Sequence, residues 1–265
     1  MSARAAPNVG AGSYGEAVND IRVSSAVPLA ELDYAVVDVE TTGFSPQDSA
    51  ITEIGAVRVR RGQAVAEYTS LVNPGTPVPA QVEALTGIHD DMLRTAPPAA
   101  AVLPGLLAFA DGCVIAAHNA RFDLGFLTAA CEAAGLPWPG FAVIDTVRLA
   151  RYLMVVPDEV PDRRLGTLAE FFGTPVQPSH RALADARATA DILMCLVERL
   201  AGRGVTTMDE LTAWLAAQDA AQEAARALAS RAGDAKPGWR GWLARALRWP
   251  RRRADNLRAW LPRLS

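Results

Sequence analysis

The sequence predicts an α/β domain in which helices flank a mixed central sheet. Three strand-like runs come first, at 33–39, 51–60 and 66–72, and the turn segment "RRGQ" predicts a hairpin between the second and third runs. Helical and strand-like segments then alternate along the chain. Antiparallel strands followed by alternating helix and strand indicate a mixed sheet covered by helices.

The segments after the hairpin have recognisable boundaries. The stretch "AQVEALTG" predicts a short helix that ends at Gly87, and "APPAAAVLPGLLAFA" predicts a longer one that contains Pro104. The apolar run "CVIAAHN" after it predicts a buried strand. Further helices are expected at about 120–134, 145–153, 167–172 and 182–200.

Length and composition set the domain organisation. With 265 residues and 50% apolar content, the chain suits one domain with a sizeable core plus appendages. No stretch reaches the roughly 18 apolar residues of a membrane span, and the first residues lack an apolar signal segment, so we expect a cytoplasmic protein. The expected parts are a flexible arm (1–30), the domain (31–203), an Ala-rich helix (204–232) and a basic tail (233–265).

The first strand ends in two carboxylates, Asp38 and Glu40, within "AVVDVETTGF". Alternate residues of a strand share a face, so the two side chains project together from Cα atoms roughly 7 Å apart. Two such charges repel each other unless a positive group lies between them. For this triplet alone, a solvated strand end is an equally good explanation.

Two further aspartates occupy apolar helix faces. On a helical wheel, Asp123 falls in the middle of an apolar arc, and Asp185 falls on the apolar half of its own helix. Removing an unpaired carboxylate from water costs several kcal/mol, so both need partners. Ion pairs with Arg121 and Arg181 are one option, although each arginine is expected to point away from its neighbouring aspartate.

The other option is metal. Oxygen ligands drawn from several elements suit Mg²⁺ or Mn²⁺, and four carboxylates can hold two such ions, an arrangement that supports in-line displacement at phosphorus. His180 lies in the loop before the helix of Asp185, and the ordinary histidine pKa of about 6.5 suits a general base. His118 and Asn119 end a buried strand; they are either structural or orient the substrate or a ligand.

Three motifs resemble those of the DEDDh 3′-5′ exonuclease superfamily, typified by the proofreading epsilon subunit of bacterial DNA polymerase III. They are "DVETTG" at 38–43, "AHNARFDLGFL" at 117–127 and "HRALADA" at 180–186. The resemblance covers about residues 33–200 and implies an RNase H-like fold. It also implies stepwise hydrolysis from a free 3′ end with release of nucleoside 5′-monophosphates.

The resemblance implies a role for each motif residue. The general base is His180, and the ligands of two Mg²⁺ or Mn²⁺ ions are Asp38, Glu40, Asp123 and Asp185. Thr41, Thr42 and Gly43 would lie along the terminal nucleotide of a single-stranded DNA or RNA 3′ end. Phe44 would stack on the terminal base, unless it belongs to the core.

The tail at 233–265 is not explained by the motifs. Residues 231–265 carry ten basic and two acidic residues, whereas the whole chain has a net charge of −3. A basic helix with tryptophans on its apolar side suits nucleic acid, a groove on a polymerase or another protein, or a membrane surface. Packing on the domain, or disorder, is the alternative.

Three functions follow from these observations. The first is a free-standing exonuclease of DNA repair or maintenance, and the second is a proofreading subunit tethered to a polymerase. The third is a binding scaffold without activity, which the intact five-residue site argues against. DNA and RNA remain alternative substrates, since a contact to the 2′-hydroxyl cannot be located in a sequence.

Overall fold

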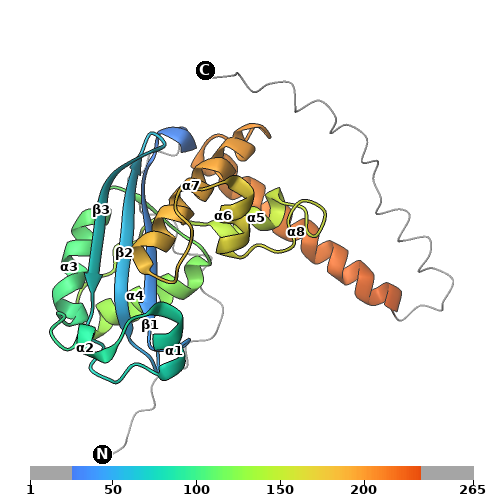
Figure 1. Cartoon of the computed structure of the whole chain (residues 1–265). Coiled ribbons are helices and arrows are strands. Elements are labelled where there is room, and N and C mark those ends of the chain that lie inside the picture. Colours follow the sequence, from blue (N-terminus) through green and yellow to red (C-terminus); the bar gives the residue numbers. More distant parts are fainter. Residues whose placement is uncertain (1–25, 234–265) are drawn as a thin grey trace, which may run out of the picture. The chain divides into compact units, whose positions relative to one another are not determined.

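The computed structural model describes residues 26–233, with side chains through residue 230. The chain divides into two compact units, of which the first ends at Thr212 and the second begins at Ala213. Residues 1–25 of the expected arm and 234–265 of the expected tail lie outside the described residues. Figure 1 traces the described elements, which keep the labels used there.

The first unit contains a five-stranded mixed sheet with strand order β3-β2-β1-β4-β5. β1, β2 and β3 pair antiparallel, whereas β4 pairs parallel to β1 and β5 parallel to β4. The prediction of a mixed sheet is therefore confirmed. The strands are β1 (Asp33–Thr41), β2 (Ile51–Arg60), β3 (Gln63–Leu71), β4 (Val114–Ala117) and β5 (Val143–Asp145).

The turn between β2 and β3 is the hairpin expected from the sequence. Its two loop residues, Arg61 and Gly62, both have positive φ angles, 49° and 74°. Positive φ at both positions gives the turn a twist that matches the flanking strands. Because β1 and β3 run antiparallel to β2, the end of β1, the start of β2 and the end of β3 lie at the same end of the sheet.

The helices agree with the expected segments within a few residues. Three short elements were not expected, namely η1, α2 and β5, because three or four residues carry too little periodic pattern. The helical elements are η1 (Leu29–Glu31), α1 (Ala80–Thr86), α2 (Asp90–Leu93), α3 (Ala99–Ala110), α4 (Ala120–Ala133), α5 (Thr146–Leu153), α6 (Leu165–Phe172), α7 (Ala182–Ala201) and α8 (Met208–Gly233).

Helices cover both faces of the sheet (Figure 1). Alternate residues of β1, namely Ala35, Val37 and Val39, join one buried core with the apolar side chains of α3 and α4. The intervening residues of β1 face the other way, toward α7, which packs on β1 and β2. Asp38 and Glu40 belong to this second set.

Residues near the two ends of the described part of the first unit pair with each other. Leu29 is buried, its backbone N–H donates to the carbonyl of Thr206, and Pro28 forms a β-bridge with Thr207. The expectation of a flexible arm therefore does not hold for Pro28 and Leu29, because their backbone is paired. The unit continues to Thr212, beyond the expected boundary at residue 203.

Of the second unit, the structure describes residues 213–233, which continue the helix α8. Most side chains of this helix between residues 213 and 230 are exposed, including Leu228 at 60%. Within the described residues, none of the helices combines the length and apolar character that a membrane crossing requires.

Candidate active site

Asp38 and Glu40 lie at the C-terminal end of β1. Asp38 is paired across the sheet with Gly55, and Glu40 with Glu53, both on β2. A register shift follows immediately, between Glu40 and Thr41. The irregularity ends the regular pairing of β1 with β2 and precedes the segment "TTGF", which starts with the last residue of β1. Both carboxylates are partly buried on the face covered by α7.

Asp123 reaches the same strand from the first turn of α4. Its side chain is only 3% exposed, and Oδ1 accepts a hydrogen bond of 3.1 Å from the backbone N–H of Val39. Val39 lies between Asp38 and Glu40, so Asp123 is fixed beside both. The prediction that this aspartate occupies the buried face of its helix is confirmed.

Asp185 and His180 come from the start of α7. Asp185 is 6% exposed and accepts a 2.8 Å hydrogen bond from the backbone N–H of Ser179. His180 is exposed, in the loop before the helix, with a φ of 55°. Potential ligand atoms of Glu40, His180 and Asp185 lie within 4.8 Å of one another, so a single cation could contact all three.

Burial raises the pKa values of all four carboxylates, and neighbouring negative charges add to the effect for Asp38, Glu40 and Asp123. Burial raises the pKa of Asp38 well above its ordinary value, and the charges of Asp123, Asp185 and Glu40 add to this. Burial is also the main cause that raises the pKa of Glu40 to about 7 and of Asp123 to about 8, and it raises that of Asp185. Such crowding of like charges favours a bound cation.

A fifth buried carboxylate, Glu53, was not predicted from the sequence as part of the site. It is 4% exposed and binds Arg181 through two side-chain hydrogen bonds, of 3.1 and 2.8 Å. Arg181 therefore pairs with Glu53 and not with Asp185, which removes one of the ion pairs considered as an alternative to metal. Glu53 could have been recognised in the sequence because it is a charged residue inside the otherwise largely apolar run at the start of β2.

His118 and Asn119 have partners within the protein. The Nδ1 atom of His118 lies 2.9 Å from Oγ1 of Thr146, and Nε2 lies 3.1 Å from the carbonyl oxygen of Arg163. Burial lowers the pKa of His118. The Asn119 backbone N–H donates to Oδ1 of Asp145. These contacts favour the structural interpretation of His118, whose ring joins β4 to α5.

Hydrogen bonds within the segment between β1 and β2 fix its conformation. Thr41 Oγ1 donates to the carbonyl of Gly43, and Thr42 exchanges hydrogen bonds with Ala50. Phe44 is 92% exposed, so it is not a core residue. An exposed apolar ring four residues after Glu40 is free to stack on a ligand.

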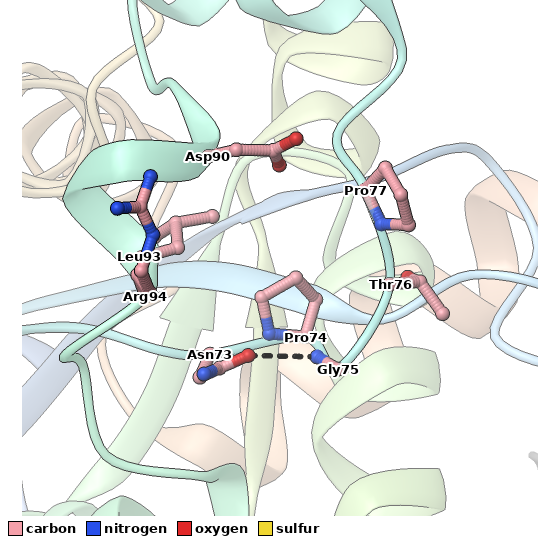
Figure 2. A pocket seen from close by; sticks show the side chains of 8 residues that line it. All are labelled: Asn73, Pro74, Gly75, Thr76, Pro77, Asp90, Leu93 and Arg94. Carbon is pink, nitrogen blue, oxygen red and sulfur yellow. Dashed lines mark hydrogen bonds between the residues drawn. The ribbon is translucent and has the colours of Figure 1, made fainter.

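A shallow pocket of about 400 Å³ lies at the α2 end of the first unit. Figure 2 shows its lining, in which Asn73 accepts a hydrogen bond from the Gly75 backbone N–H, with Asp90 and Arg94 on α2 and the segment after it. The pocket shares no residue with the carboxylate cluster. Its lining includes one acidic residue, Asp90, and one basic residue, Arg94, so it favours neither an anionic nor a cationic ligand.

Solved exonuclease structures resemble this chain. Exonuclease X, in complex with 5′ overhanging duplex DNA, matches 66% of this chain and 95% of its own, with a TM-score of 0.50 and 27% identity. Exonuclease I of E. coli, in complex with a dT13 oligonucleotide, matches 64% of this chain and 42% of its own, with a TM-score of 0.56 and 18% identity. The fold is the RNase H-like fold of these exonucleases.

Sequence relatives are longer proteins. A bifunctional exonuclease/endonuclease protein of Mycobacterium tuberculosis is 46% identical over 208 residues, which cover 76% of this chain and 32% of the relative. A PolC-type DNA polymerase III of Caldanaerobacter subterraneus is 38% identical over 185 residues, 70% of this chain and 13% of the relative. The chain thus spans a third or less of these relatives. The exonuclease family of RNase T matches residues 35–193, the stretch that contains all four carboxylates and His180, and the chain belongs to this family.

Proposed function

We propose that this chain is a divalent-metal-dependent 3′-5′ exonuclease that removes nucleoside 5′-monophosphates one at a time from single-stranded DNA. The observation that carries the proposal is the meeting of four carboxylates and one histidine from β1, α4 and the start of α7 at one edge of the sheet. Membership of an exonuclease family supports the reaction class. The catalytic unit would be the described part of the first compact unit, up to Thr212.

The donor set fits two hard divalent ions. The ligands would be Asp38, Glu40, Asp123 and Asp185. Burial raises their pKa values, and for the first three neighbouring negative charge, which a cation would compensate, adds to the effect. Carboxylate oxygens from several elements suit Mg²⁺ or Mn²⁺. Bound ions would stabilise the charge that develops on the phosphate and would lower the pKa of the attacking water.

His180 would accept the proton of that water. Its exposed position allows the ring to exchange the proton with solvent, and its closeness to Glu40 and Asp185 would bring it to the reacting phosphate. General base catalysis contributes about 10²- to 10⁴-fold to a rate. We therefore expect His180→Ala to lower kcat by such a factor and to leave metal binding largely intact.

The loop after β1 would receive the 3′ end. Backbone groups of Thr41, Thr42 and Gly43 would lie along the terminal nucleotide, and Phe44 would stack on its base, a contact that tolerates any sequence. Of the two other candidates, Asn119 is exposed, whereas His118 has both ring nitrogens engaged. We assign His118 a structural role and leave Asn119 as a candidate for a substrate contact.

DNA is the favoured substrate because a relative named for DNA polymerase III shares 38% identity with this chain. The deciding experiment offers matched DNA and RNA oligonucleotides, labelled at either end, with Mg²⁺ or EDTA. We expect loss of a 3′ label as mononucleotide, faster on DNA and absent in EDTA. An inactive Asp38→Ala variant and an active Glu132→Gln variant, which alters an exposed carboxylate of α4, are the controls. Unaltered protein that releases no label would refute the proposal.

The PolC-type relatives also favour a second candidate function, proofreading in association with a polymerase. In that case the basic tail at 233–265 would hold the partner, whereas a free-standing enzyme would use it to hold DNA. Full-length protein and a version ending near residue 230 separate the two functions. Co-purification of a polymerase with the full chain alone would favour proofreading, and a loss of salt-sensitive DNA binding on truncation would favour the free enzyme.

A further inference from the structure

Glu53 is the buried carboxylate that the proposed chemistry does not use. It lies near the start of β2 and accepts three hydrogen bonds: from Nε of Arg181 at 3.1 Å, from a terminal guanidinium nitrogen of Arg181 at 2.8 Å, and from the backbone N–H of Ala182 at 2.9 Å. A buried carboxylate is tolerated only when such donors satisfy it. All three donors belong to one short stretch at the start of α7.

Glu53 therefore caps α7 from another element of the fold. The first N–H groups of a helix have no partner within the helix, and usually the residue before the helix accepts from one of them. Here that residue is Arg181, whose side chain makes no such bond. The carboxylate of Glu53 takes its place at the N–H of Ala182, where the helix dipole also favours negative charge.

The neighbouring Gly55 brings the two backbones into contact. A Cβ atom at this position would lie only 2.3 Å from the carbonyl carbon of Ala182 and from the nitrogen of Leu183. The start of α7 thus rests directly on β2. Glu53 and Gly55 together determine where this end of the helix sits on the sheet.

His180 lies between two anchored neighbours. On one side, the backbone N–H of Ser179 donates to Asp185, and on the other side Arg181 binds Glu53. His180 itself adopts a left-handed φ of 55°, which costs about 1–2 kcal/mol for a residue with a Cβ atom. The surrounding contacts must hold the backbone in this conformation.

We propose that Glu53 and Arg181 form a positioning pair that holds His180 in its catalytic orientation, without either residue touching the substrate. The inference rests on the proposed role of His180 as the base. It adds Glu53, a residue of β2, to the residues of β1, α4 and α7 on which the reaction would depend. In this inference β2 has two functions: its backbone pairs with β1, and the side chain of Glu53 fixes the start of α7.

The test compares Glu53→Gln with Glu67→Gln. Glu67 forms a second two-bond pair with an arginine of α7, Arg187, at 2.7 and 2.6 Å, but on the exposed strand β3. We expect Glu53→Gln to lower kcat by about 10- to 100-fold with KM changed less than about 3-fold, as for other groups that orient a functional residue. Glu67→Gln should keep the unaltered kcat. Equal kcat values for the two variants would overturn the inference.

Arg181→Lys provides a second variant that keeps the positive charge and loses the two-bond geometry. It should lower kcat in the same direction, and thermal unfolding of each variant identifies any that fails to fold. A double mutant with His180→Ala then tests the route. If the pair acts through His180, Glu53→Gln has no further effect on kcat in that background. An undiminished effect there would overturn the inference.

Hydrogen exchange gives a readout that does not depend on activity. Because Glu53 accepts from the N–H of Ala182, Glu53→Ala should speed exchange of this amide by about 10-fold or more relative to Glu67→Gln. Unchanged protection would overturn the inference even in an active enzyme. Unaltered protein without nuclease activity would instead refute the proposed function, and the exchange data would still report on the contact.

Discussion

The backbone N–H of Val39 donates a hydrogen bond of 3.1 Å to Oδ1 of Asp123. This contact joins β1 to the first turn of α4, although the two residues are far apart in the sequence. It fixes the aspartate beside the two carboxylates that flank Val39 on the strand. Three acidic side chains are therefore held by two rigid elements, and their repulsion is built into the folded state.

Relief of that repulsion should appear as a gain in stability. Asp123→Asn keeps an oxygen that can accept from Val39 and removes a buried charge. We expect the variant to unfold with a free energy about 1–3 kcal/mol higher than that of the unaltered protein at pH 8 in EDTA. Chemical denaturation measures this difference. A less stable variant would contradict the electrostatic argument.

The same variant should lose activity. An amide is a poorer ligand for Mg²⁺ than a carboxylate, so we expect the rate of mononucleotide release to fall by about 100-fold or more. The control is Glu132→Gln, which changes an exposed carboxylate of the same helix. Comparable rates for the two variants would show that Asp123 holds no catalytic ion.

Stability should fall as the pH rises through neutrality when divalent ions are removed. The pKa of Glu40 is raised to about 7 and that of Asp123 to about 8, so the folded chain holds protons that the unfolded chain loses near pH 4. Because the folded state binds more protons, the free energy of unfolding decreases from about pH 5 to pH 8 by a few kcal/mol.

Denaturation in EDTA across this range measures the slope, and addition of Mn²⁺ should restore stability most strongly at the alkaline end. Asp123→Asn should flatten the profile because it removes one of the groups responsible. A profile that rises from pH 5 to pH 8 in EDTA would show that these pKa values are not raised in the folded chain.

Gly55→Ala should strongly destabilise the domain. The new methyl group would lie 2.3 Å from the backbone of α7, and neither backbone can move without loss of the packing around it. We expect a loss of about 3 kcal/mol or more in thermal or chemical unfolding. Gly166→Ala in α6 is the matched control, because a Cβ there meets no atom within 4 Å and alanine favours a helix.

Phe44→Ala should weaken substrate binding and leave stability unchanged. The ring is 92% exposed, so its removal costs no packing, whereas loss of stacking on a base costs about 1–3 kcal/mol. Binding of a labelled oligonucleotide in a His180→Ala background, where hydrolysis is slowed, measures the change. Val65→Ala, at an exposed apolar residue of β3, should bind as the parent does. Equal affinity of both variants would exclude a contact to Phe44.

The sequence carried enough information for most of the fold and for the acidic residues of the site. Long strands and helices have clear periodicity, and Asp123 and Asp185 were conspicuous because a carboxylate on an apolar helix face violates the pattern around it. Three-residue β5 and four-residue α2 lacked such a pattern. The extent of the flexible arm was overestimated because pairing of Pro28 and Leu29 with Thr206 and Thr207 depends on a distant segment.

Side-chain partners were the part that could not be predicted. Arg181 and Glu53 are far apart in the sequence, and only the packing of α7 on β2 brings them together. The environment of Phe44 was equally undetermined, because an aromatic residue after a strand fits a core or a surface equally well. His118 required the positions of Thr146 and Arg163, which come from two other segments.

The β-bridge between Pro28 and Thr207 has a consequence for how this fold can be carried in longer polypeptides. Residues near the two ends of the described first unit are neighbours, so flanking sequence can be attached on both sides, or the unit can be inserted as a whole, without stretching the host backbone. Relatives in which the matching region makes up 13% or 32% of the length are chains of this longer kind. A member of this exonuclease family with neighbouring ends can therefore be carried as one part of a larger protein.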